Sequence, residues 1–201
     1  MVTAVFNNRY NRRGGISAGV MHGTSLIEVL VTIVILAIGL LGVAGLEVRL
    51  QASEMEAYQR AQALVLLDDM ASRIATNRAN AAAYVADAPA PTGVGGTGNC
   101  NFGTATREKS DVTEWCNALQ GAGETSSGSK VGAMVGGRGC VEDLGGNQYL
   151  VTVAWQGLGR LSAPPASVAC GQGNYSGGTG CTNDSCRRAV TTIVRIGNLA
   201  S

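Results

Sequence analysis

The longest apolar run in the chain covers residues 29–46, eighteen positions without a charged side chain. Leu26 and Ile27 extend this run to nearly the roughly 20 residues that cross a lipid bilayer as a helix. The run is uniformly apolar rather than periodic. We therefore predict a membrane-spanning helix over residues 24–46.

The pattern becomes periodic beyond Leu46. Apolar residues recur there every three or four positions, as on one face of a helix, at Ala57, Ala61, Leu64, Leu67, Ala71 and Ile74. No proline interrupts residues 24–88. We predict an amphipathic helix over residues 47–85 that lays this stripe on a head domain. The alternative, an isolated coiled coil, fits the short and alanine-rich run less well.

The head is expected to occupy residues 86–201. A polar N-cap and a later glycine predict a short helix over residues 110–119. The GAGETSSGSK segment that follows has the composition of a flexible loop. Alternating apolar residues and a Gly-Gly-Asn turn predict three strands, at residues 139–144, 148–155 and 188–196. The predicted fold class is α+β.

All six cysteines lie in the second half of the chain, at Cys100, Cys116, Cys140, Cys170, Cys181 and Cys186. An even number of cysteines indicates disulfides in an oxidising compartment. A zinc site is the alternative, but the chain has no CxxC pair and its one histidine, His22, precedes the apolar run. Six cysteines allow fifteen pairings, and the sequence does not choose among them.

The net charge of +1 hides an asymmetry, because Arg9, Arg12 and Arg13 precede the apolar run and no acidic residue does. The positive-inside rule then places the N terminus in the cytoplasm and the cysteine-bearing half outside it. Without residues 1–23 the chain has 12 basic and 14 acidic residues. This balance lacks the clustered cations that nucleic acid requires, so we predict no nucleic-acid binding.

We predict that the protein is not an enzyme and holds no cofactor or metal. Aromatic residues make up only 4% of the chain and glycines number 29, which does not favour a compact catalytic core. The expected head contains no histidine and no Ser/Lys pair or paired carboxylates in a catalytic arrangement. The glycine-rich segment 93–100 lacks the lysine of a phosphate-binding loop.

Glu28 lies two residues inside the apolar stretch. A carboxylate near the centre of a membrane costs at least about 2.5 kcal/mol, so an acid within such a helix usually has a partner. Alternatively, Glu28 lies at the level of the lipid headgroups, where the positive end of the helix dipole favours it.

The segment Gly23-Thr24-Ser25-Leu26-Ile27-Glu28 resembles the class III cleavage signal of type IV prepilins. The resemblance implies that a prepilin peptidase cuts between Gly23 and Thr24, and that Glu28 becomes the fifth residue of the mature chain. It also implies an N-methylated amine on Thr24, where the family usually has phenylalanine or methionine. We hypothesise that Glu28 pairs with the Thr24 amine of an adjacent subunit.

Residues 22 to about 80, together with the EWCNAL and YLVTVAWQG segments, resemble PilV-type minor pilins, the type IV pilus modification proteins. The resemblance implies a cleaved leader over residues 1–23 and the type IV pilin fold, a long N-terminal helix packed on an antiparallel sheet. It also implies an inner-membrane protein with a periplasmic head that later joins the pilus at the cell surface. Its partners would be other minor and major pilins, and its roles motility, attachment or DNA uptake.

Other interpretations remain open. A type II secretion pseudopilin has a similar cleavage signal, and an adhesin or binding domain on a plain single-span anchor explains the apolar run but not Gly23 and Glu28. A secretory signal peptide cut near Gly42-Val43-Ala44 is a further alternative, although its apolar region is usually about 7 to 15 residues long.

Overall fold

The computed structural model describes residues 23, 25–123, 125–130, 132, 134–177 and 180–197. The chain divides into two compact units, Met1–Leu46 and Glu47–Ser201. The first contains the apolar part of a long helix. The second contains the rest of that helix, two further α-helices and the sheets.

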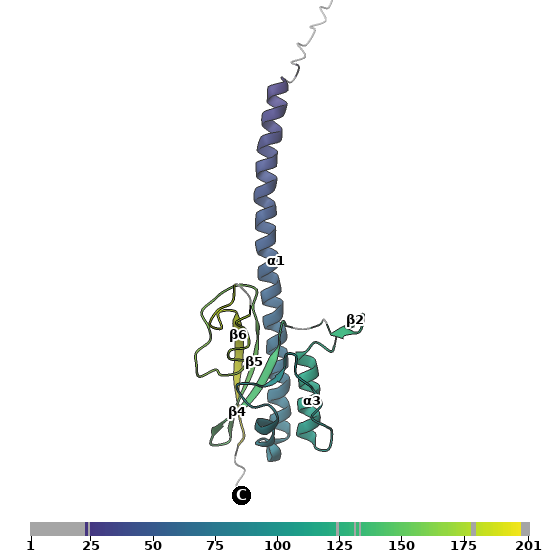
Figure 1. Cartoon of the computed structure of the whole chain (residues 1–201), viewed down its shortest axis with the longest axis vertical. Helices are drawn as coiled ribbons and strands as arrows, with labels where there is room; N and C mark the ends of the chain where they lie inside the picture. Colours follow the sequence, from purple (N-terminus) through teal and green to yellow (C-terminus); the bar gives the residue numbers. More distant parts are fainter. Residues whose placement is uncertain are drawn as a thin grey trace, which may run out of the picture. The chain divides into compact units, whose positions relative to one another are not determined.

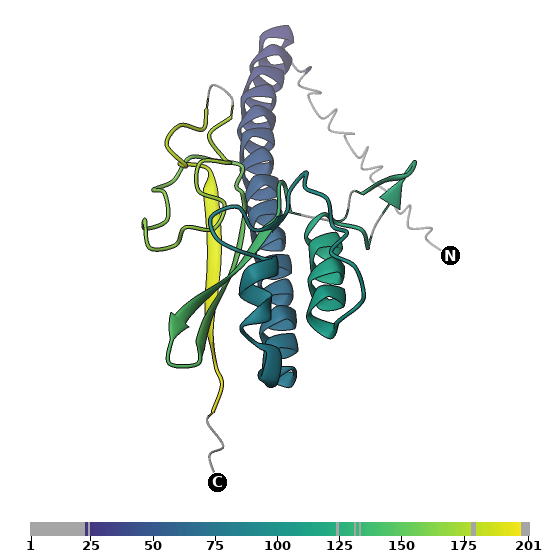
Figure 2. The same cartoon turned by 60° about the horizontal axis from the view of Figure 1, so that its bottom comes forward.

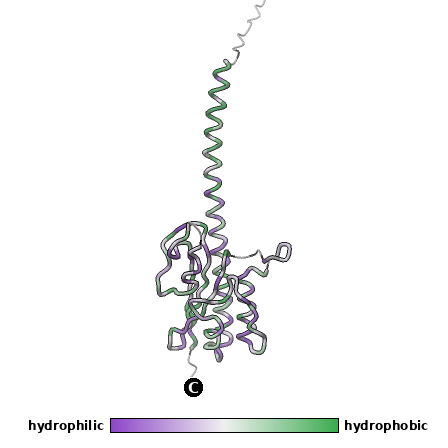
Figure 3. Tube along the Cα trace, viewed as in Figure 1, coloured by the Kyte–Doolittle hydropathy of each residue, from purple (hydrophilic) through white to green (hydrophobic). Residues whose placement is uncertain are grey.

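Helix α1 (Leu26–Thr76) has 51 residues, and its apolar part is long enough to cross a membrane. Every side chain of this helix up to Leu46 is exposed. Figure 3 shows that the first part of α1 is mostly apolar and that more polar residues follow. An exposed apolar helix of this length is stable only where lipid or other apolar surfaces surround it.

Within the second unit, α1 buries one stripe of side chains, those of Gln59, Ala63, Leu67, Met70 and Ile74. The predicted stripe was only partly right, because Leu67 and Ile74 are buried whereas Ala57, Ala61 and Leu64 are exposed. Compared with the predicted stripe, the face of α1 that packs on the head is shifted around the helix axis and includes Ala63 and Met70. Alanines are frequent on both faces of this segment, so their spacing alone did not reveal which face packs on the head.

Helix α1 also ends earlier than predicted, at Thr76 rather than near residue 85. Asn77 leaves the helical conformation with φ −104° and ψ 39°, and its side-chain amide donates a 3.1 Å hydrogen bond to the Tyr84 hydroxyl. A short 3₁₀ helix, η1 (Arg78–Asn80), and helix α2 (Ala83–Asp87) follow, so the chain folds back along the end of α1 (Figure 2).

The main sheet has four antiparallel strands, in the order β1-β4-β5-β6: β1 (Val94–Gly95), β4 (Arg138–Gly145), β5 (Gln148–Gln156) and β6 (Arg187–Arg195). The turn between β4 and β5 contains Gly146 and Asn147 with φ values of 60° and 59°, which suit a tight hairpin. Strands were predicted at 139–144, 148–155 and 188–196; the start of β5 is as predicted, and each of the other ends differs by one residue.

A second, two-stranded sheet forms where the sequence predicted a flexible loop, between β2 (Thr125–Ser126) and β3 (Ser129–Lys130). Ser127 and Gly128 make its turn, with φ values of 51° and 80°. Lys130 ties this hairpin to helix α3 (Arg107–Leu119), because its ammonium group donates to the side-chain oxygens of Asn117 and Gln120 at 2.9 and 2.8 Å.

The core lies between α1, α3 and one face of the sheet (Figure 1). Side chains on β5 alternate, and Tyr149, Val151, Val153 and Trp155 face this core. Trp115 of α3 is fully buried against them. The head therefore combines a helix with an antiparallel sheet, in agreement with the α+β prediction.

The three disulfides join Cys100 to Cys116, Cys140 to Cys170, and Cys181 to Cys186. All six predicted cysteines are paired, and none is free. The zinc alternative is wrong, because every thiolate that it requires is oxidised. The disulfides attach the loop before α3 to that helix and fasten the long, polar segment between β5 and β6.

Candidate functional site

Helix α1 begins immediately after Ser25, whose main-chain carbonyl accepts hydrogen bonds from the N–H groups of Glu28 at 2.9 Å and Val29 at 3.2 Å. Ser25 therefore occupies the N-cap position, which serine favours. Gly23 lies two residues earlier and is exposed, with open space around its α-carbon. None of the described residues therefore obstructs the Gly23 side of the predicted cleavage bond.

Glu28 is the acidic residue of the first turn of α1. Its side chain is exposed, and its sequence neighbours Ile27 and Val29 are exposed apolar residues. Within the described part of the chain, no cation forms an ion pair with Glu28. The helix dipole stabilises a carboxylate at this position, but in an apolar environment the charge still needs a cation.

Thr24 and the first 22 residues lie outside the described residues. The predicted cleavage bond and the predicted methylation site are therefore described on one side only, at Gly23. In the uncut chain the nitrogen of Thr24 belongs to a peptide bond, so the cation that Glu28 is predicted to pair with forms only after cleavage.

A polar cluster around Arg73 joins α1 to α3. The Arg73 guanidinium contacts the carboxylates of Asp69 at 3.0 Å, Asp111 at 2.9 Å and Glu114 at 2.8 Å. The Tyr84 hydroxyl donates a 2.6 Å hydrogen bond to Asp111. Burial, reinforced by this hydrogen bond, raises the pKa of Tyr84 to about 12. The single cation of Arg73 offsets part of the charge of these three carboxylates, and its ion pairs with Asp111 and Glu114 link α1 to α3.

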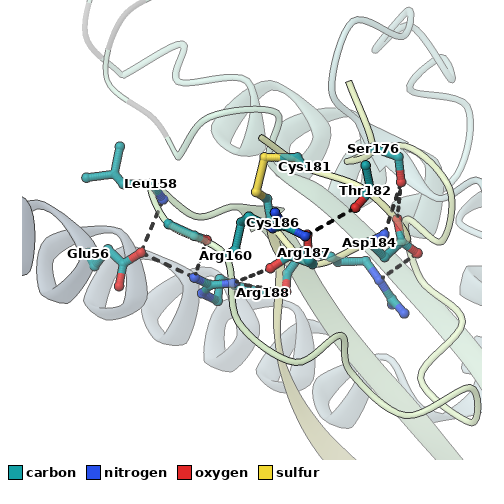
Figure 4. Close-up of a disulfide and its surroundings, with 12 residues drawn as sticks. Glu56, Leu158, Arg160, Ser176, Cys181, Thr182, Asp184, Cys186, Arg187 and Arg188 are labelled. Carbon is teal, nitrogen blue, oxygen red and sulfur yellow. Dashed lines mark hydrogen bonds and ion pairs between the residues drawn. A yellow bond between two sulfur atoms is a disulfide. The ribbon is translucent and has the colours of Figure 1, made fainter. Parts of the chain in front are cut away.

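A groove of about 420 Å³ lies between α1 and the sheet within the second unit. Ser53, Glu56 and Arg60 of α1 line one wall, and Trp155, Arg188 and Val190 line the other. Figure 4 shows Glu56 at one side of this groove, where its carboxylate pairs with Arg188 at 3.3 Å and accepts the N–H of Leu158 at 3.1 Å. These contacts fasten the start of the β5–β6 connection and the first residues of β6 to α1.

The β5–β6 connection has a polar interior of its own (Figure 4). The Asp184 carboxylate accepts the N–H of Gly173 at 3.0 and 2.9 Å and lies 3.3 Å from the guanidinium of Arg187. Arg187 is almost fully buried and donates to the carbonyl oxygens of Val168 at 2.6 Å and Cys170 at 3.0 Å. A buried cation with these partners stabilises a loop that has few apolar side chains.

The sequence interpretation missed both polar clusters. Local spacing could have indicated the pairs Asp69–Arg73 (i,i+4) and Asp184–Arg187 (i,i+3). The other pairs are far apart in the sequence, because Asp111 is 38 residues from Arg73 and Arg188 is 132 residues from Glu56. In the described residues no group of three or more His, Cys, Asp and Glu side chains is placed to hold a metal ion.

Comparison of this chain with family models, with curated proteins and with solved structures gave no match. The head offers polar contacts that hold loops and helices in place. Chemically, the exposed start of α1 presents a peptide bond at Gly23, a carboxylate at Glu28 and an apolar surface.

Proposed function

We propose that this chain is a minor pilin, a structural subunit that primes or joins the assembly of a type IV pilus. The observation that carries the proposal is Glu28, an acid in the first turn of an exposed apolar helix, with no ion-pair partner among the described residues and with an exposed Gly23 shortly before it. A plain anchor needs neither the acid nor the glycine.

The proposed mechanism is a charge pair created by processing. Cleavage after Gly23 would give Thr24 an ammonium group next to the apolar helix, where an isolated cation is as costly as the isolated carboxylate of Glu28. A Thr24 ammonium on one subunit and Glu28 on the next neutralise each other. The pair also sets the axial register between two helices that are otherwise uniformly apolar.

The head fits an exported subunit. Three disulfides are stable in an oxidising compartment such as the periplasm, and the arginine-rich segment before α1 favours a cytoplasmic N terminus. The proposed partners are other minor and major pilins. The inner membrane would hold the subunit before it joins the pilus. Motility, attachment and DNA uptake are the processes that such a pilus would serve.

Mass spectrometry of the mature N terminus tests this proposal. The full chain would be expressed in a membrane that contains a prepilin peptidase. The expected product begins at an N-methylated Thr24, and a Gly23→Glu variant should keep its first 23 residues. A wild-type chain that retains Met1 would contradict the proposal, and a start near Gly45 would indicate a signal peptide.

A second experiment separates a pilus from a secretion pseudopilus. The gene for this chain would be deleted in its host, and surface pili and secreted proteins would be counted in parallel. Loss of pili with normal secretion supports the minor pilin assignment. Loss of secretion with normal pili would assign the chain to the secretion system, in which a similar cleavage signal is used.

A further inference from the structure

Strand β6 forms a free edge of the main sheet. The hydrogen bonds that flank its pairing with β5 run from Gly157 N–H to Cys186 C=O and from Ile196 N–H to Asn147 C=O. In the observed register these two bonds place the main-chain groups of residues 188, 190, 192 and 194 toward β5. The main-chain groups of Ala189, Thr191 and Ile193 therefore point away from the sheet.

This edge is accessible and regular. Thr191 is exposed, and Ile193 is 46% exposed. No hydrogen bond from another described residue reaches the outward groups of Ala189, Thr191 or Ile193. Strand β6 contains neither a proline nor a break in register, two of the devices that protect an edge from further pairing, and its three charged residues lie at its two ends. The strand therefore presents a template for one more strand.

The groove beside this edge selects what can bind there. The groove has apolar surface from Ala57, Trp155, Ala189 and Val190, against which an apolar side chain of an added strand can pack. Its walls also contain Glu56 and Arg188, which pair with each other. Arg60 lies in the opposite wall, and among the described residues no carboxylate is within ion-pair distance of it. Arg195 at the far end of β6 is exposed and likewise has no such carboxylate.

We propose that the free edge of β6 and the adjoining groove bind an extended, acidic segment of a partner protein by strand addition. Main-chain hydrogen bonds to Ala189, Thr191 and Ile193 supply the binding energy common to all such complexes. An apolar side chain in the groove and acidic residues near Arg60 and Arg195 supply the selectivity. The proposal concerns the head alone and does not depend on processing at Gly23.

A second copy of β6 is a poor occupant on grounds of charge. The strand contains Arg187, Arg188 and Arg195 and no acidic residue. Arg187 is buried and paired with Asp184, and Arg188 is paired with Glu56, so neither is available to a second strand. A second copy of β6 would bring another exposed Arg195 and no carboxylate, so the partner strand should be acidic and different from β6.

The test uses the full chain in detergent and a fluorescent peptide of alternating valine and threonine with an aspartate at each end. A peptide with the same sequence but N-methylated at alternate amides is the control, because it cannot form the edge hydrogen bonds. We expect the first peptide to bind and the methylated peptide to bind at least about tenfold more weakly. Hydrogen exchange at Ala189, Thr191 and Ile193 should slow on binding.

Two variants make the assignment specific. Thr191→Pro removes one outward N–H without removing a bond to β5, and we expect it to weaken binding about tenfold or more, whereas Thr191→Val keeps the N–H and should bind normally. Arg60→Glu, at an exposed position, should weaken binding of the acidic peptide even if Thr191→Pro fails to fold. Absence of binding, or equal binding by all variants, would overturn the proposal. Self-association of the wild-type chain that Thr191→Pro abolishes would overturn the acidic partner in favour of a second copy.

Discussion

The indole nitrogen of Trp115 donates a 2.8 Å hydrogen bond to the main-chain carbonyl oxygen of Leu66 in α1. This bond links two elements 49 residues apart in the chain, at the centre of the core. Trp115 thus holds α3 on α1 both by packing and by a directed polar contact.

Replacing Trp115 by Phe should lower the free energy of unfolding by about 1–3 kcal/mol, since it removes the hydrogen bond and leaves a small cavity. Denaturant unfolding of the full chain in detergent, followed by near-ultraviolet circular dichroism, measures this loss. Tyr58→Phe is the matched control, because Tyr58 is half-exposed and should change stability by less than about 0.5 kcal/mol. Equal losses in the two variants would argue against the role of Trp115.

Gly139 of β4 lies directly under the same indole ring. A Cβ at this position would be 2.2 Å from Cη2 of Trp115, closer than packed atoms can approach. Gly139→Ala should therefore destabilise the head by about 1–3 kcal/mol through overpacking. Gly159→Ala, where a Cβ would meet nothing within 4 Å, should leave the unfolding free energy nearly unchanged. A stable Gly139→Ala variant would show that the ring can move aside.

Glu142 should make the head less stable as pH rises. One of its carboxyl oxygens is buried without a hydrogen-bond partner among the described residues, and burial raises its pKa above the ordinary 4.5. The folded state therefore keeps this proton to higher pH than the unfolded state does. Stability from this group is complete below the ordinary pKa and is lost as pH rises through the raised one.

Glu142→Gln should remove this pH dependence, so the variant should gain stability over the wild type between about pH 4 and pH 7. Denaturant unfolding at both pH values provides the comparison, with the exposed Glu54→Gln as control. An unchanged difference between wild type and Glu142→Gln across this range would show that the carboxyl group finds a partner in solution.

The three disulfides should contribute unequally. In the loop-entropy model the 30-residue closure by Cys140 and Cys170 stabilises by about 3.6 kcal/mol, and the 5-residue closure by Cys181 and Cys186 by about 2 kcal/mol. Paired alanine substitutions of each disulfide, compared by thermal unfolding, measure the order. The reverse order would indicate that the short loop is needed to place Asp184 and Arg187.

Under the proposed pilin function, Glu28→Leu should leave membrane insertion intact and abolish incorporation into filaments, because the apolar helix becomes longer while the proposed charge partner of the Thr24 amine disappears. Membrane fractionation and immunoblotting of sheared pili measure the two properties separately. Glu47→Leu, which changes an acid beyond the apolar segment, is the matched control. Normal incorporation of Glu28→Leu would rule out the charge pair.

The spacing of apolar residues predicted the secondary structure better than the amino-acid composition of each segment did. Strands β4, β5 and β6 could be predicted because one face of each packs on a core. Apolar side chains therefore occur at every second position, as at Tyr149, Val151 and Val153. The end of α1 could not be predicted, because the alanine-rich residues after Thr76 suit a helix equally well. There the hydrogen bond between Asn77 and Tyr84, a contact made only in the folded state, helps to define the turn.

The long-range contacts could not be predicted from the sequence for a different reason. Cysteine count and location indicate disulfides, but the partner of Cys140 depends on where the β5–β6 connection crosses the sheet. The Glu56–Arg188 and Arg73–Asp111 pairs likewise depend on how α1 is rotated against the head. The cleavage signal at the start of α1 stays a prediction, and it rests on the order of the residues alone, since such a signal is a local feature of a chain.

All three covalent cross-links lie beyond Thr76, the last residue of α1. The disulfides therefore link the sheet and its loops covalently. The long helix packs on them through noncovalent contacts such as Trp115 with Leu66 and Arg188 with Glu56. A pulling force applied to α1 would therefore act first on these noncovalent contacts, and α1 would separate from the head before the disulfide-linked part unfolds.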